Sequence, residues 1–169
     1  QYFLFIITLI INLIPSYTNA QGFSWLSSVS GGNSNDLIYT KSIVTDNLGY
    51  SYITGTFFNG ATIDTVTLNS VGEEDVFLAK LDKNGKLLWV ETVGGLGKDI
   101  SFDIELDRQG GLYFSGVFTD TAFFDTITVS GAIQTQSNVP LGINFLAKYD
   151  TTGTIQWIKK GAQTTTYNF

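Results

Sequence analysis

A hairpin sequence that occurs twice limits the folds open to this chain. Residues 77–89 read FLAKLDKNGKLLW, and residues 145–157 read FLAKYDTTGTIQW, 68 positions further along. Each copy places an Asp-x-x-Gly turn between two apolar runs, the pattern of a β-hairpin. A single small sheet cannot bury both of its faces, so a chain that repeats such a unit is expected to stack its copies.

The repeat extends well beyond the hairpin. The pattern D-x-x-G-x-x-Y-x-x-G-x-F begins at Asp46 and again at Asp107. Two further pairs of segments match, namely GGNSND (31–36) with GGLGKD (94–99), and ATIDTVTL (61–68) with AFFDTITV (122–129). Trp25, Trp89 and Trp157 occupy the same position in three successive copies of the repeat. We expect a repeat region over 21–169, with units of about 25–88 and 89–156 and a third unit starting at 157.

The strand pattern predicts an all-β chain. In SFDIELD (101–107), one face carries Phe102, Ile104 and Leu106, and the other carries Asp103 and Glu105. SYITGTF (51–57), GLYFSGVF (111–118) and AFFDTITV (122–129) are further predicted strands. Gly55 and Gly116 lie inside such runs and indicate a bulge or a close approach between backbones.

Units of about 60 residues with four or five short strands and no helix favour a β-propeller. We therefore predict four-stranded antiparallel blades in an incomplete ring, because propellers typically have about 4–8 blades. A β-solenoid or tandem sandwiches remain alternatives. In a closed ring, a returning FLAK-like strand would pair with 24–30, and the missing blades of the full-length chain would be partners of this fragment.

The long combined pattern resembles the bacterial SBBP-type β-propeller repeat. The residues that carry the resemblance between 74 and 118 are Asp75, Phe77, Ala79, Lys80, Asp82, Gly85, Trp89, Gly94, Gly95, Asp99, Asp107, Gly110, Tyr113 and Gly116. Departures are Asn144 in place of Asp75, Ala162 in place of the second Gly of the pair, and Gly111 where the family often has Asn. The resemblance implies a secreted or surface-exposed protein, in a family that often carries a C-terminal sorting domain.

The first 20 residues are predicted to be a signal peptide whose basic beginning is missing. The run YFLFIITLIINLIP (2–15) is shorter than the ~20 residues of a membrane span. Ala20, with Thr18 two positions before it, suits cleavage by signal peptidase. We expect secretion or a cell-surface location, and no stable membrane span after cleavage.

Composition excludes several kinds of chemistry. The chain has neither Cys nor His, which removes disulfides, thiol nucleophiles, histidine bases and nearly every zinc site. Its net charge is −6 and its nine basic residues are scattered, so we expect no nucleic-acid partner. GGLGKD (94–99) lacks the spacing of a phosphate-binding loop.

Eight acids form four repeat-matched pairs, which are Asp36/Asp99, Asp46/Asp107, Asp64/Asp125 and Asp82/Asp150. Acids repeated unit after unit are predicted to be turn and cap residues rather than a catalytic pair or a calcium site. The acid cluster EED (73–75) is predicted to be a solvated turn. We assign no catalytic, cofactor-binding or metal-binding residue and expect no cofactor.

One irregular insertion, SGAIQTQSNVPLG (130–142), lengthens the second unit. Insertions in repeat proteins form loops, and loops carry recognition. Its amides and hydroxyls would suit a neutral glycan. The sequence predicts a non-enzymatic module for binding, adhesion or scaffolding with a glycan or protein ligand. The alternatives are an accessory part of a secreted carbohydrate-active enzyme, whose catalytic residues lie elsewhere, and a purely structural surface module.

Overall fold

The computed structural model describes residues 29–30, 36–131, 135–136, 139–140 and 142–164. Within these ranges every regular element is a β-strand and none is a helix, which confirms the all-β prediction. No helix in this described part could therefore cross a membrane. The predicted signal peptide (1–20) and Trp25 lie outside the described residues.

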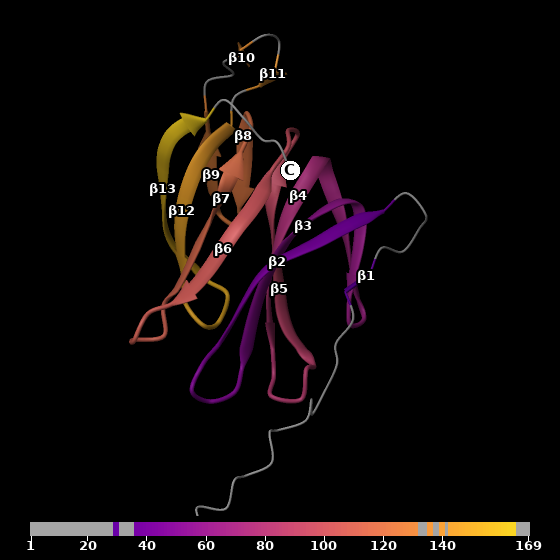
Figure 1. The fold of residues 1–169 in the computed structure, drawn as a ribbon, viewed down its shortest axis with the longest axis vertical. Coiled ribbons are helices and arrows are strands. Elements are labelled where there is room, and N and C mark those ends of the chain that lie inside the picture. The colour runs from indigo at the N-terminus through magenta and orange to yellow at the C-terminus, as the bar shows by residue number, and fades with distance from the viewer. Residues whose placement is uncertain (1–28, 31–35, 132–134, 137–138, 141, 165–169) are drawn as a thin grey trace, which may run out of the picture.

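The described strands form a seven-stranded antiparallel sheet, a four-stranded antiparallel sheet and a two-stranded pair. Four strands of the larger sheet, which we call sheet 1, have the same order as the four-stranded sheet, which we call sheet 2, and the two lie side by side in Figure 1. Sheet 1 contains, in spatial order, β2 (Leu37–Thr45), β3 (Ser51–Ile63), β4 (Val66–Leu81) and β5 (Leu87–Gly95). Sheet 2 contains β6 (Ile100–Leu106), β7 (Leu112–Phe118), β12 (Gly142–Tyr149) and β13 (Ile155–Thr164). The remaining strands are β1 (Val29–Ser30), β8 (Thr121–Phe124), β9 (Ile127–Ser130), β10 (Thr135–Gln136) and β11 (Val139–Pro140).

The sheets are shifted by one strand from the units expected in the sequence. β5 lies mostly within the unit 89–156, yet it completes sheet 1 by pairing with β4. β13 likewise pairs with β12 and completes sheet 2. Each sheet therefore takes three strands from one sequence unit and its fourth strand from the start of the next.

The same backbone pairing recurs in both sequence units. In each unit, a short hairpin pairs with the strand at the start of that unit, and in the second unit this first strand is β5, so the pairing joins sheet 1 to the hairpin that follows β7. Val29 of β1 pairs with Ile63 at the end of β3. One unit later, Val93 of β5 pairs with Phe124 of β8. The repeat found in the sequence is therefore also a repeat of strand pairing.

One segment that was predicted to be a single strand is a hairpin, and so is its repeat counterpart. AFFDTITV (122–129) turns at Asp125 and Thr126, so that β8 pairs with β9. Its counterpart ATIDTVTL (61–68) turns at Asp64 and joins the end of β3 to the start of β4. Asp64 and Asp125 have φ angles of 55° and 50°, a left-handed conformation that Asp tolerates better than most residues.

The prediction for SFDIELD was wrong at Phe102. The β6–β7 register passes from Ser101 to Asp103, so Phe102 occupies a bulge and is 40% exposed, while Ile104 is buried. The bulge faces Gly116, where a Cβ would lie 2.4 Å from the carbonyl oxygen of Ile100. The expected bulge and close backbone approach at this glycine are thus confirmed.

Strand register also corrects one of the sequence matches. Asn144 pairs with Val117, just as Val76 pairs with Thr56 one unit earlier. Asn144 therefore corresponds to Val76, and Ile143 stands in the place of Asp75. The acid at position 75 has no counterpart in the second unit.

The main core lies between the two sheets. The face of sheet 1 that contributes to it carries Tyr52, Leu78 and Trp89, and we call it the receiving face of sheet 1. Sheet 2 contributes large aromatic and aliphatic side chains of its opposite face, among them Phe114, Phe145 and Tyr149. A second cluster, on the other face of sheet 1, contains Ile53, Phe57, Ala61, Ile63, Leu68, Phe77, Ala79 and Leu81.

Polar side chains of sheet 1 hold the β12–β13 turn of sheet 2. The ammonium of Lys80 and the indole N–H of Trp89 both donate to the carbonyl oxygen of Thr151, at 3.0 Å and 3.2 Å. Gly153 of the same turn lies against the indole ring, where a Cβ would be 3.2 Å from Cδ2 of Trp89. We call Lys80 and Trp89 the clamp of sheet 1.

Candidate binding site

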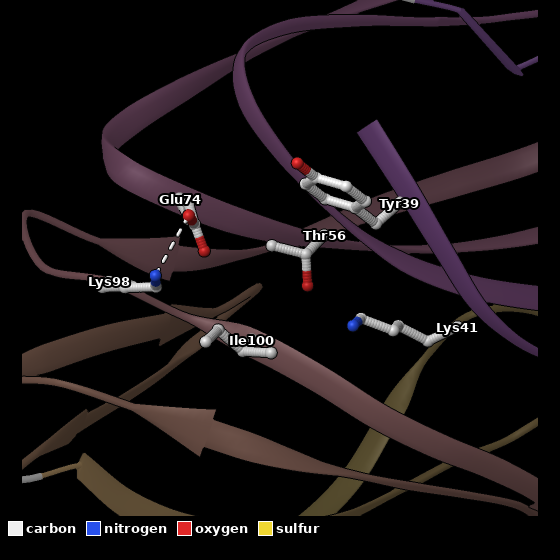
Figure 2. A pocket seen from close by; sticks show the side chains of 6 residues that line it. All are labelled: Tyr39, Lys41, Thr56, Glu74, Lys98 and Ile100. Atoms are coloured by element: carbon white, nitrogen blue, oxygen red, sulfur yellow. Dashed lines mark ion pairs between the residues drawn. The ribbon is translucent and has the colours of Figure 1, made fainter. Parts of the chain in front are cut away.

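A pocket of about 280 Å³ opens where β2, β3, β4 and β6 meet. Its lining residues, all drawn in Figure 2, are Tyr39, Lys41, Thr56, Glu74, Lys98 and Ile100. Lys41 extends into the space from β2, and Glu74 lies across from it on β4. None of these residues was predicted from the sequence to line a binding site, although Glu74 belongs to EED (73–75) and Lys98 to GGLGKD (94–99), because the six residues come from segments that are distant in the chain.

The pocket holds one acid, and that acid is paired. The ammonium of Lys98 lies 3.1 Å from Oε1 of Glu74. The hydroxyl of Thr56 accepts a hydrogen bond from the backbone N–H of Ser101 at 3.1 Å, which ties the pocket wall of β3 to β6. A single ion-paired carboxylate lacks the second acid that glycoside hydrolysis ordinarily uses. The side chains instead offer an aromatic ring, two ammonium groups and hydrogen-bonding oxygens.

Two buried acids lie close behind this pocket. Asp99 is 0% exposed, and its carboxylate accepts hydrogen bonds from the backbone N–H groups of Gly95 and Thr119 at 2.7 Å and 3.2 Å. Burial raises the pKa of Asp99 to about 7, although these hydrogen bonds act in the opposite direction. The neighbouring charge of Asp75 raises it further. Asp99 therefore joins the end of sheet 1 to the strands of sheet 2.

Asp75 corrects the prediction of a solvated turn at EED (73–75). The segment lies inside β4, and Asp75 is 2% exposed. Its Oδ2 accepts the backbone N–H of Val71 at 2.8 Å, whereas Oδ1 is buried without a hydrogen-bond partner. Burial raises the pKa of this carboxyl. Space for it exists because position 94 is a glycine, where a Cβ would lie 2.3 Å from Oδ1.

The acids of the Asp-x-x-Gly turns bind their own backbone, as predicted. Oδ1 of Asp107, for example, accepts the N–H groups of Gln109 and Gly111 at 2.8 Å and 2.7 Å. The same two bonds recur in the turns that begin at Asp46, Asp82 and Asp150. Backbone hydrogen bonds hold the pKa of Asp82 and Asp107 below its usual range. These carboxylates serve the turns and are not grouped at one site.

A second, more open depression of about 530 Å³ lies between the first turns of the two sheets. The rings of Tyr50 and Tyr52 line one side, with Lys80 4.5 Å and 5.1 Å above their centroids. Asp107 and Arg108 line the other side. The depression is thus continuous with the clamp of sheet 1, because its lining includes Lys80 of the clamp and Thr151, to which the clamp donates.

The described residues provide no metal site, and those in the inserted loop line neither the pocket nor the depression. Among the described residues, no group of three or more acids is placed to hold a metal ion. Of the insertion 130–142, residues 132–134, 137–138 and 141 lie outside the described residues, and Thr135–Gln136 pairs with Val139–Pro140. The suggestion that this loop binds a glycan stays a prediction.

Comparison with known proteins adds no family assignment. No protein-family model matches the chain, and no curated protein matches it.

Proposed function

We propose that this chain is part of a secreted or cell-surface β-propeller of the SBBP type that serves binding, adhesion or scaffolding rather than catalysis. The observation that carries the proposal is the pairing that recurs in both sequence units, at Val29 with Ile63 and at Val93 with Phe124. It supports an architecture in which the first strand of each unit completes the preceding sheet and pairs with a hairpin of its own unit.

The way in which the sheets converge favours a radial over a linear arrangement. The backbones approach each other at the first strands, where β6 lies beside β2 and β3. There the hydroxyl of Ser42 donates to Oδ1 of Asp103 at 2.6 Å, and these two residues occupy the same position in their units. Contact between equivalent first strands is the geometry of blades around a common axis.

The chemistry of the pocket supports binding. Glu74 is paired with Lys98, and the turn acids are held by backbone N–H groups. Tyr39 supplies a half-exposed ring, the ammonium of Lys41 lies 5.9 Å from the centroid of this ring, and Lys98 lines the same pocket. A ring next to a few fixed polar groups is the ordinary composition of a small-ligand site. We propose a glycan as the ligand of this pocket.

A panel of immobilised polysaccharides tests this proposal with the natural chain. We expect retention without release of reducing ends, and about tenfold weaker retention for Tyr39→Ala. Lys83→Ala, at an exposed residue of the β4–β5 turn, is the control and should bind as the natural chain does. Release of reducing ends that is lost in Glu74→Gln would contradict the proposal, because it would make Glu74 a catalytic acid.

A further inference from the structure

Sheet 2 carries a second copy of the surface with which sheet 1 holds its neighbour. The receiving face of sheet 2 consists of Tyr113, Leu146, Lys148 and Trp157, the repeat counterparts of Tyr52, Leu78, Lys80 and Trp89. Trp157 pairs with Lys148 as Trp89 pairs with Lys80, so the same two side chains stand next to each other on adjacent strands.

The two receiving faces differ in what covers them. Leu78 is 0% exposed, because sheet 2 packs over it. Leu146 occupies the same position in sheet 2 and is 40% exposed. Tyr52 is completely buried, whereas Tyr113 is only partly buried and packs edge-on against Trp157 with ring centroids 5.9 Å apart.

The lysine of the clamp also has a different partner in each sheet. In sheet 1, Lys80 reaches across to the carbonyl oxygen of Thr151 in the neighbouring turn. In sheet 2, Lys148 turns to its own unit, where its ammonium lies 3.0 Å from Oδ2 of Asp107 and 3.2 Å from the hydroxyl of Tyr113. Its hydrogen bond to Asp107 raises the pKa of Lys148.

We propose that Lys148 and Trp157 form a docking site for a third unit of the repeat, presented through the Asp-x-x-Gly turn of its FLAK-type hairpin. The occupied clamp of sheet 1 shows the chemistry that this site recognises. The carbonyl oxygen of the residue after Asp accepts hydrogen bonds from the ammonium and the indole N–H. The glycine, in a left-handed conformation, leaves the ring face uncovered by a Cβ.

Docking requires only a small rearrangement of the site. Lys148 would exchange its bond to Asp107 for the carbonyl oxygen of the arriving turn, as Lys80 is seen to do in sheet 1. The apolar side chains of the third unit would then cover Leu146, which removes apolar surface from water. This inference rests on the proposed repeat architecture, but it does not depend on glycan binding at the pocket.

The test extends the full chain by a second copy of residues 96–164, joined after Thr164. Hydrogen exchange of the indole N–H groups is followed by NMR, with Trp→Phe variants for assignment. In the extended chain, we expect exchange at Trp157 to slow by about tenfold or more, as for a buried hydrogen-bonded group. Exchange at Trp89 should stay the same in both chains.

Lys148→Met in the extended chain should restore fast exchange at Trp157, whereas Lys86→Met, at an exposed lysine of the β4–β5 turn, should leave it slow. A third copy that stays unfolded, or that folds without slowing exchange at Trp157, would overturn the docking site. So would protection that survives Lys148→Met. Loss of glycan binding in the pocket variants, with slow exchange at Trp157 intact, would separate the two proposals.

Discussion

Gly153 in the last turn of sheet 2 lies directly against the indole ring of Trp89 in sheet 1. A Cβ at this position would be 3.2 Å from the ring, and the φ angle of Gly153 is 90°. Two constraints therefore favour glycine at position 153. The turn requires a positive φ angle there, and the ring of Trp89 leaves little room for a Cβ.

Alanine substitutions at glycines 110 and 153 should distinguish the cost of backbone strain from the cost of contact with Trp89. Both residues have a positive φ, of 84° and 90°, so each variant loses about 1 kcal/mol to backbone strain. A Cβ at Gly110 has room, since its nearest neighbour is 3.7 Å away. Gly153→Ala should cost about 1–2 kcal/mol more than Gly110→Ala, because its methyl group also pushes the ring of Trp89 away. Equal losses in urea unfolding would mean that the ring contact is absent.

The equivalent leucines of the two receiving faces should respond differently to truncation. Leu78→Ala removes a fully buried side chain and should lower the free energy of unfolding by about 2–4 kcal/mol. Leu146→Ala truncates a side chain that is 40% exposed and should cost less than about 1 kcal/mol. Urea denaturation of both variants measures the difference. Similar losses would show that Leu146 is already covered in solution.

The pH dependence of stability should report on Asp99. Burial raises the pKa of Asp99 to about 7. The unfolded chain therefore releases this proton near pH 4, whereas the folded chain keeps it until about pH 7. The free energy of unfolding therefore falls as pH rises through this window, by at most about 4 kcal/mol from this group.

The same measurement on Asp99→Asn isolates that contribution. The natural chain should lose stability relative to this variant between about pH 4.5 and pH 7.5, because the variant has no proton to release there. Glu105→Gln, at an exposed acid of β6, should change nothing across this interval. A natural-chain stability that stays parallel to that of Asp99→Asn would argue against a raised pKa at this site.

Local patterns in the sequence were sufficient to predict the repeated turns and most of the strands. Asp107 and Gly110 determine their turn through bonds within five residues, so the pattern alone predicts it. Phe102 was misplaced because a bulge opposite Gly116 depends on strand pairing, which alternation along one strand does not reveal. The Asp125 hairpin was missed because no glycine marks its turn.

The candidate site could not be predicted from local patterns. Lys41, Glu74 and Lys98 come from three strands, and only the packing of β6 beside β2 and β3 brings them together. The burial of Asp75 likewise depends on the absence of a side chain at Gly94, across the sheet. Both features arise from tertiary contacts between residues on different strands.

Detecting the contact between Trp89 and Gly153 in solution is the most direct test of the way in which sheet 2 packs on sheet 1. In a two-dimensional NOE spectrum of the natural chain, cross-peaks should link the α-protons of Gly153 to ring protons of Trp89, and the ring should shift those α-protons upfield. Trp89→Leu should abolish both effects. Absence of these cross-peaks in the folded natural chain would contradict face-to-face docking of sheet 2 on sheet 1.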